Sequence, residues 1–339
     1  MPLSGLVTAS EMQSVCHTVN LLSTRTGRSK SQSRPKVIVI GEFFIDEVLS
    51  GFQMLPKLGE ESFARHLRRE VGGGAAITAC GLSKLGVPVA VMGAVGKEGG
   101  EWVIGRLAAC GVDCSGLEMD PGEPTGLTVS VSTREDRAFF SYYGANRLLP
   151  RLLSRPETLR TLKRARHVHF ACAPDGELDE PLFLALRRAR CRLSVDVQSH
   201  ISWLTRPESL SILRHCDIFF PNEREAEWIS GEIGTHRILR ALRDKGLRGV
   251  GLKLGGKGAA LLWRKRELLA DPWPVDTVDT TGAGDCFDAG FIYGWLRGET
   301  PQRCLEIANI CGALSTRSLG GLAAFPSPEE LETSLSSKF

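Results

Sequence analysis

From residue 36 onward, short apolar runs alternate with longer stretches in which apolar residues recur every three or four positions. Consecutive apolar positions indicate strands of a sheet that is covered on both faces. We predict strands at residues 37–41, 89–96, 167–173, 193–197, 217–221 and 249–255. Helical periodicity lies between them, for example over residues 75–85 and 181–189. This alternation favours an α/β fold with a doubly wound, mostly parallel sheet flanked by helices.

Two stretches, residues 47–69 and 125–143, break this rhythm because apolar and polar residues alternate in them. Such alternation indicates half-buried strands, and the second stretch predicts an antiparallel pair around a turn at residues 134–136. We expect these strands to form a small β-sheet lid over the active site. Its open edges would allow a homodimer that pairs through the lid. The alternative is a pair of edge strands that extends the main sheet.

The first 35 residues are rich in Ser, Thr and Arg and contain a single acidic residue, Glu11. This composition predicts a disordered N-terminal extension, followed by one domain over residues 36–339. An Arg- and Ser-rich, acid-poor leader is also typical of an organellar transit peptide, which we consider the less favoured interpretation.

Composition narrows the class of protein. The net charge is only +3 with a sequence pI of about 8.3, and basic and acidic residues are intermixed, so we expect no nucleic-acid partner. The absence of a long apolar run and of a signal-peptide pattern predicts a soluble, cytoplasmic protein without a membrane partner. The ten cysteines are scattered without C-x-x-C spacing, which favours reduced thiols.

Candidate chemistry gathers in the segment DTTGAGDCFDAG at residues 279–290. The preceding VDTVDTT has the composition of a strand, and the apolar period after it predicts a helix that begins near Gly282. The first amides of a helix lack intrahelical partners, so Gly282, Ala283 and Gly284 would form an anion hole that a phosphate can approach. Asp285 in that first turn could accept a proton from an attacking alcohol. Alternatively, this carboxylate only caps the helix.

The segment VDTTGAGDCFDAGF resembles the C-terminal signature of the ribokinase/PfkB family of carbohydrate and nucleoside kinases. Other segments are similar to the family's motifs in the same order, from residue 36 to about residue 331. They are GEFFIDEVLSG, EVGGGAAITACGLSKLG, YYGAN, DIFFPNEREAEWISG, GLKLGGKGAALL and IANICGALSTRSLGGLAAFPSPEEL.

The resemblance implies an ATP-dependent kinase that needs Mg²⁺ and phosphorylates a hydroxyl of a sugar or sugar-like metabolite. Asp285 would be the general base beside the anion hole. The implied substrate-binding residues are Asp46, Gly72, Gly73 and Asn146, and the implied nucleotide-binding residues are Asn222, Lys253, Gly255, Gly258 and Asn309. Glu225 would organise the metal, and Asp279 and Thr281 a monovalent cation such as K⁺. Asn222 and Glu225 also have the spacing of a helix capping pair.

Two other glycine-rich segments do not match the phosphate-binding motifs that they resemble, the P-loop and the dinucleotide-binding motif. Residues 251–257 spell G-x-x-x-x-G-K, but Gly258 stands where a P-loop requires Ser or Thr. Residues 72–74 cannot begin G-x-G-x-x-G, because Ile77 occupies the place of the third glycine.

The substrate pocket departs from that of ribose kinases, which have polar residues at the positions of Phe44, Gly74, Ile77 and Cys172. Losing hydrogen-bonding groups lowers specificity for a small polyol. Alternatives are therefore a nucleoside kinase or a catalytically silent member that binds a sugar or nucleotide. The aromatic residues Phe43, Phe44, Phe140, Tyr142 and Tyr143 could stack on a ring or pack in the protein.

Overall fold

A computed structural model of the chain describes residues 37–337, except positions 53, 55, 133–136, 175–178 and 199. The chain divides into residues 1–33 and 34–339, and every element described below belongs to the second unit. The expected N-terminal extension and the expected turn at residues 134–136 lie outside the described residues.

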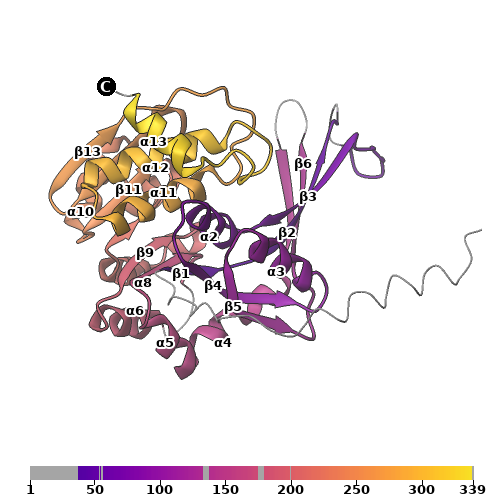
Figure 1. Ribbon diagram of the computed structural model, residues 1–339, viewed down its shortest axis with the longest axis horizontal. Coiled ribbons are helices and arrows are strands. Elements are labelled where there is room, and N and C mark those ends of the chain that lie inside the picture. The colour runs from indigo at the N-terminus through magenta and orange to yellow at the C-terminus, as the bar shows by residue number, and fades with distance from the viewer. Residues whose placement is uncertain are drawn as a thin grey trace, which may run out of the picture. The chain divides into compact units, whose positions relative to one another are not determined.

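A nine-stranded sheet with the order β13-β12-β11-β10-β9-β8-β1-β4-β5 forms the centre of the unit (Figure 1). Neighbouring strands are parallel from β5 to β11, and β12 and β13 continue the sheet antiparallel. This arrangement confirms the predicted fold class. The strands are β1 Val37–Gly41, β4 Val89–Gly96, β5 Asp113–Asp120, β8 His167–Ala171, β9 Arg192–Asp196, β10 Ile218–Phe219, β11 Gly249–Lys253, β12 Ala259–Trp263 and β13 Arg266–Ala270.

Helices cover both faces of this sheet, which explains the unbroken apolar runs. In β1, Val37 and Val39 pack into one hydrophobic core, whereas Ile38 and Ile40 pack into the other. The first core contains α2 Gly74–Lys84, α3 Gly100–Ala109, α11 Ala283–Arg297, α12 Pro301–Ser315 and α13 Pro328–Ser336. The second contains α4 Leu149–Leu153, α5 Pro156–Leu162, α6 Asp179–Arg188, α7 Ile201–Leu204, α8 Pro207–His215, α9 Glu223–Ser230 and α10 Thr235–Asp244.

A separate four-stranded sheet has the order β3-β2-β6-β7. Its strands are β2 Phe44–Ser50, β3 His66–Gly72, β6 Gly126–Ser132 and β7 Arg137–Tyr142 (Figure 1). The β6–β7 pair is antiparallel as predicted, while β2 and β6 are parallel. Because these strands pair with one another, the alternative that they extend the main sheet is wrong.

The segment VDTVDTT forms no strand, which corrects the prediction made from its composition. Instead the amides of Val278 and Asp279 both donate to the carbonyl oxygen of Thr316, at 2.8 and 3.0 Å. These bonds attach the segment to the end of α12 rather than to a neighbouring strand.

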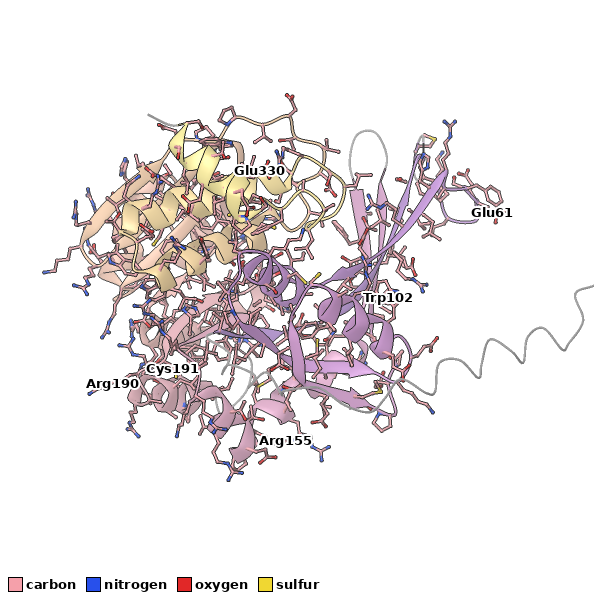
Figure 2. The ribbon with its side chains drawn as sticks, in the orientation of Figure 1. Glu61, Trp102, Arg155, Arg190, Cys191 and Glu330 are labelled. Carbon is pink, nitrogen blue, oxygen red and sulfur yellow. The ribbon has the colours of Figure 1, made fainter. Side chains whose placement is uncertain are left out.

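The nine cysteines in the described part of the chain are free thiols. Cys191, before β9, is buried beside the exposed Arg190 (Figure 2). Among the helices that the structure describes, none has the length and hydropathy needed to cross a bilayer.

Candidate active site

The helix α11 begins where the sequence predicts, at a left-handed glycine. Gly282 is its N-cap with φ of 70°, a conformation that residues with a side chain rarely adopt. A Cβ atom at this position would also lie 2.7 Å from Cδ1 of Ile77. The amide of Ala283 donates to the carbonyl oxygen of Thr280 at 3.2 Å, so this member of the expected anion hole already has a partner.

A cavity of about 480 Å³ borders the first turn of α11. Its lining brings together six residues expected at the nucleotide and phosphate sites: Lys253, Gly255, Gly258, Ala283, Gly284 and Asn309. A larger cavity, of about 550 Å³, lies beside α5 and β5 and contains none of the predicted site residues. The smaller cavity is therefore the one that adjoins the candidate chemistry.

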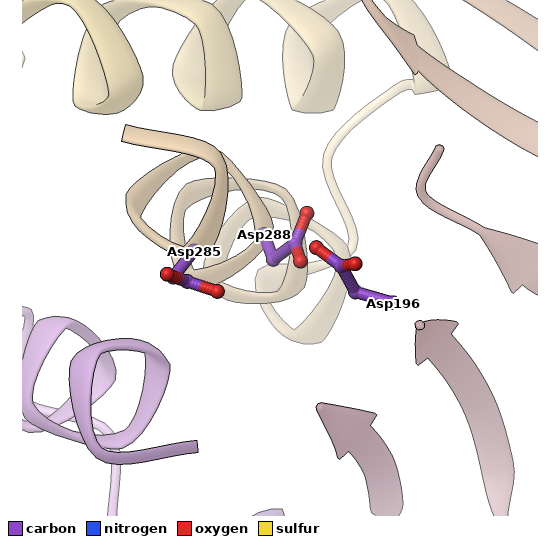
Figure 3. A group of neighbouring side chains, drawn as sticks. All are labelled: Asp196, Asp285 and Asp288. Atoms are coloured by element: carbon purple, nitrogen blue, oxygen red, sulfur yellow. The ribbon is translucent and has the colours of Figure 1, made fainter. Parts of the chain in front are cut away.

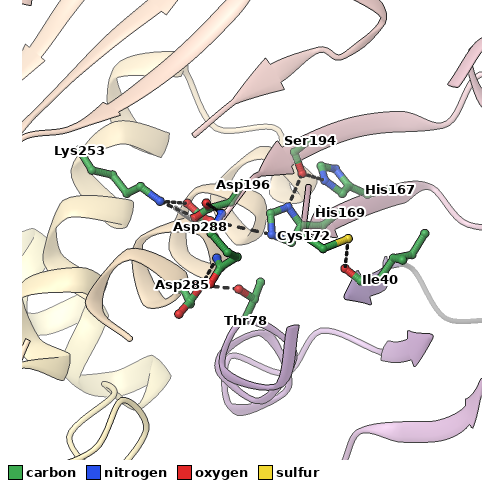
Figure 4. Close-up of polar contacts among 11 residues, drawn as sticks. Ile40, Thr78, His167, His169, Cys172, Ser194, Asp196, Lys253, Asp285 and Asp288 are labelled. Carbon is green, nitrogen blue, oxygen red and sulfur yellow. Dashed lines mark hydrogen bonds and ion pairs between the residues drawn. The ribbon is translucent and has the colours of Figure 1, made fainter. Parts of the chain in front are cut away.

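Asp285 is nearly buried, with 7% of its surface exposed. The side-chain Nε2 of Gln198 donates a 2.8 Å hydrogen bond to Oδ1 of Asp285. Thr78 donates to the backbone carbonyl of Asp285 at 3.2 Å (Figure 4). Burial, and then the Asp196 carboxylate, raise the pKa of Asp285 to about 7, against the lowering effects of Lys253 and Gln198. A carboxylate with a pKa near neutrality is suited to act as a general base.

Gln198 is held in place by its backbone. It has a left-handed φ of 54°, and its amide donates to Oδ1 of Asp196 at 2.9 Å. Gly74 leaves room for the contact with the base, since a Cβ there would lie 2.4 Å from Cδ of Gln198 and 2.5 Å from Oδ1 of Asp285.

Two further carboxylates lie beside Asp285. Oxygens of Asp196, Asp285 and Asp288 lie within 4.8 Å of one another (Figure 3). The ammonium group of Lys253 lies 2.5 Å from Asp196 and 3.6 Å from Asp288 (Figure 4). Burial raises the pKa of Asp288 well above its ordinary value. In Asp196, the effects of Lys253 and neighbouring hydrogen bonds outweigh burial and lower the pKa.

The expected acceptor site gathers around Asp46 on β2. Burial, together with the charge of Glu70, raises the pKa of Asp46 to about 6. A Cβ on Gly72 would lie 2.1 Å from Oδ1 of Asp46, and one on Gly73 would lie 2.2 Å from the carbonyl oxygen of Glu42. The missing side chains of Gly72 and Gly73 therefore allow their backbone to lie close to Asp46 and to the backbone of Glu42.

Asn146 lies in this region but contacts the backbone. Its Oδ1 accepts from the amide of Phe43 at 2.9 Å, and its Nδ2 donates to the carbonyl oxygen of Phe43 at 3.0 Å. The side chain thereby holds the link between β1 and β2. Nearby, Tyr143 donates to the carboxylate of Glu42.

Asn222 and Glu225 form a capping box at the start of α9. Oδ1 of Asn222 accepts from the Glu225 amide at 2.9 Å, and Oε2 of Glu225 accepts from the Asn222 amide at 3.0 Å. Backbone pairing with Lys253 places Asn222 beside the cavity. The capping alternative thus describes the observed contacts, and a metal role stays a prediction.

The other predicted site residues form two further groups. Asn309, which lines the cavity, donates to the carbonyl oxygen of Asp271 at 2.7 Å. Asp279 accepts from the backbone and hydroxyl of Thr281, at 3.0 and 2.8 Å, and from the amide of Gly320 at 3.0 Å. Asp279 and Thr281 therefore tie the loop before α11 to the loop after α12.

Of the four positions that depart from ribose kinases, two are core positions. Ile77 and Cys172 are 6% and 1% exposed, and Gly74 contributes only backbone beside the base. Phe44 packs edge-on against Tyr143 at 6.2 Å between ring centroids. Phe43 is fully buried, whereas Phe140 and Tyr142 are exposed on β7.

Sequence reasoning missed Asp196, Gln198, Asp288 and Glu42. Two signals were present, because Asp196 ends a buried strand and Asp288 is an acidic residue within an apolar helix. The contact between Gln198 and Asp285 spans 87 positions, so no local pattern reports it.

Comparisons with known proteins identify the family of the chain. A family model described as pfkB family carbohydrate kinase matches residues 34–328. A deoxyribokinase of Salmonella typhi is 27% identical over 308 residues, which cover 88% of this chain and 98% of the relative.

Two solved structures share the fold and contain ligands. Arabidopsis thaliana ribokinase complexed with ribose and ATP has a TM-score of 0.79 and 25% identity, covering 89% of this chain and 99% of that one. A ribokinase II candidate from E. coli in complex with ATP and Mg²⁺ has a TM-score of 0.77 and 26% identity, with the same coverage.

Proposed function

Since the chain belongs to the pfkB family of carbohydrate kinases, we propose that it transfers the terminal phosphoryl group of ATP to a hydroxyl of a sugar, with Asp285 as general base. The observation that carries this proposal is the first turn of α11. There Asp285 stands one residue after Gly284, whose backbone lines the cavity of about 480 Å³.

In the proposed reaction, the acceptor hydroxyl attacks the terminal phosphorus while Asp285 removes its proton. A bond forms between the acceptor oxygen and phosphorus, the bond from phosphorus to the oxygen of the leaving ADP breaks, and the proton stays on Asp285. The amides of Gly282 and Gly284 would stabilise charge on the phosphoryl oxygens, because the positive end of a helix dipole faces that position. The amide of Ala283 would first have to release the carbonyl oxygen of Thr280.

ATP would occupy the cavity between the loop at Gly255 and Gly258 and helix α12. A Cβ on Gly258 would lie 2.2 Å from the carbonyl oxygen of Ala270, so this turn is closed by close backbone packing. Asn222 and Glu225 offer the oxygen donors that Mg²⁺ prefers, beside Lys253. When bound, Mg²⁺ would neutralise charge on the triphosphate.

We infer a sugar acceptor rather than a nucleoside. The relatives named above act on or bind deoxyribose or ribose by their names. The acidic residues Asp46 and Glu42 suit hydroxyl recognition, since carboxyl groups accept hydrogen bonds from neighbouring hydroxyls.

Two further features belong to the proposal. The small sheet would serve as the lid, because its strand β2 carries Asp46. The exposed Leu67, Phe139 and Phe140 of this sheet favour pairing with a second copy of the chain. Asp279 and Thr281 would bind K⁺ behind the anion hole through their oxygen atoms. Light scattering would test the dimer, and K⁺ titration of the rate would test the cation.

A panel of sugars and nucleosides with Mg²⁺ and ATP tests the proposed function. We expect the highest kcat/KM for a sugar. Faster turnover of adenosine or another nucleoside would replace the sugar with a nucleoside acceptor. Binding of ATP without turnover of any acceptor would identify a catalytically silent member instead.

A further inference from the structure

Lys253 is distinctive among the residues around the nucleotide cavity. Of the described residues that line it, Lys253 alone carries a charge. A Cβ built on Gly284 would lie 3.3 Å from Nζ of Lys253, so the ammonium group lies against the first turn of α11. The cation therefore stands where the cavity meets the proposed phosphoryl site.

The carboxylates around Lys253 fix its position. Asp196 forms an ion pair with it at 2.5 Å, and Asp288 lies at 3.6 Å from the same nitrogen. The lysine side chain is 13% exposed, which leaves little freedom for other rotamers. Figure 4 shows the ammonium group directed at both carboxyl groups.

The protonation states leave Lys253 charged. Although burial alone would lower the pKa of Lys253, Asp196 and Asp288 raise it well above its ordinary value. Burial raises the pKa of Asp288 well above its ordinary value, whereas in Asp196 burial is outweighed by Lys253 and neighbouring hydrogen bonds, which lower the pKa.

Phosphoryl transfer requires positive charge at this location. ATP carries about four negative charges, of which one Mg²⁺ offsets two, and the transition state spreads charge over the phosphoryl oxygens. Donors fixed in a low-dielectric site stabilise that charge strongly, because they need not reorient during the reaction.

We propose that Lys253 is a catalytic residue that donates hydrogen bonds to the phosphoryl group in transit, and that Asp196 and Asp288 are positioning residues for its ammonium group. The inference rests on the proposed kinase function. Lys253 neither gains nor loses a proton in this role, since the proton of the acceptor hydroxyl goes to Asp285. Its contribution is electrostatic, and it is largest in the transition state.

The test compares Lys253→Met with Lys265→Met, a matched control on the exposed turn between β12 and β13. We expect Lys253→Met to lower kcat by roughly a hundredfold or more, as for loss of one preorganised donor. The KM for ATP should change far less. The control should keep the wild-type rate.

Calorimetric binding of Mg·ADP with and without aluminium fluoride gives a readout independent of turnover. Aluminium fluoride imitates the phosphoryl group in transit and should increase the affinity of the wild type for Mg·ADP. Lys253→Met should lose most of this increase, while its affinity for Mg·ADP alone should equal that of the wild type. Equal loss of both affinities would indicate only ground-state binding and would overturn the proposal.

Removing Lys253 leaves the Asp196 charge buried and unpaired, which can impair folding. The double variant Lys253→Met/Asp196→Asn removes both charges and should recover the melting temperature but not kcat. Recovery of kcat together with stability would show that Lys253 is only structural. Failure of the wild-type enzyme to phosphorylate any sugar would instead overturn the proposed function itself.

Discussion

The side-chain amide of Gln198 donates a 2.8 Å hydrogen bond to Oδ1 of Asp285, and the bare backbone of Gly74 lies against both groups. Three segments distant in the sequence thus converge on the proposed base. Gln198 fixes the direction of the carboxylate and favours its ionised form, while burial opposes ionisation.

The pH dependence of the rate should report this balance. Because the pKa of Asp285 is about 7, the base is protonated at lower pH, and kcat/KM should fall about tenfold per pH unit below that value. Gln198→Leu removes a donor that lowers the pKa of Asp285, so the acidic limb should move to higher pH. Gln302→Leu is the matched control, because it removes a side-chain amide that donates to the carbonyl oxygen of Leu269 instead of to Asp285. This variant should keep the wild-type pH profile. An unmoved limb in Gln198→Leu would show that this contact does not tune the base.

The stability of the folded protein should also depend on the ionisation of Asp285. Ionisation permits catalysis but should lower the melting temperature. The folded-state pKa of Asp285 is raised from 3.8 to about 7, so its contribution is fully present below pH 3.8 and is lost as pH rises through 7. Asp285→Asn should therefore melt at a higher temperature than the wild type at pH 8, and the difference should shrink towards pH 4. A melting temperature that is lower at pH 8 would contradict this assignment.

Gly74→Ala should impair catalysis without preventing ATP binding. Its Cβ would collide with Gln198 and Asp285, at 2.4 and 2.5 Å, and displace the base. Gly105→Ala in α3 is the control, because no heavy atom lies within 4 Å of its new Cβ. That variant should be as active as the wild type and about 0.5–1 kcal/mol more stable. Equal activity of both variants would show that the Gly74 contact is unimportant.

Glu225→Gln separates helix capping from metal binding. Glutamine keeps an oxygen that can accept from the Asn222 amide, so the melting temperature should change little. If Glu225 organises Mg²⁺, the concentration of Mg²⁺ needed for half-maximal rate should rise at least about tenfold. An unchanged Mg²⁺ requirement would leave Glu225 with the capping role alone.

The parts of the fold that depend on local pattern were predictable. The strand at Val37–Gly41 is buried on both faces, so its apolar run is unbroken, and the helix start at Gly282 follows from a short glycine motif. The β5 strand, DCSGLEMD, was missed because it lies at the sheet edge and includes polar residues. The prediction of a strand at VDTVDTT was wrong, because hydrogen bonds to Thr316, which is distant in the sequence, determine the conformation of this segment.

Residue chemistry and spacing alone predicted the part of the site that one segment supplies, and the family resemblance added Lys253, Gly255, Gly258 and Asn309, which line the same cavity. The sequence pattern indicated Asp285 and its neighbouring glycines together. Gln198, Asp196 and Lys253 come from the ends of β9 and β11, and they meet α11 only through the topology of the sheet. The partners that set the pKa of the base were therefore beyond the reach of local motifs.

The rate of Asp285→Asn with ATP, Mg²⁺ and the best sugar of the panel tests the central claim most directly. Asparagine keeps the shape of the side chain but cannot take the proton from the acceptor hydroxyl. We predict a fall in kcat of about 10²- to 10⁴-fold with Mg·ATP affinity retained. Phosphoryl transfer at the wild-type rate would contradict the account.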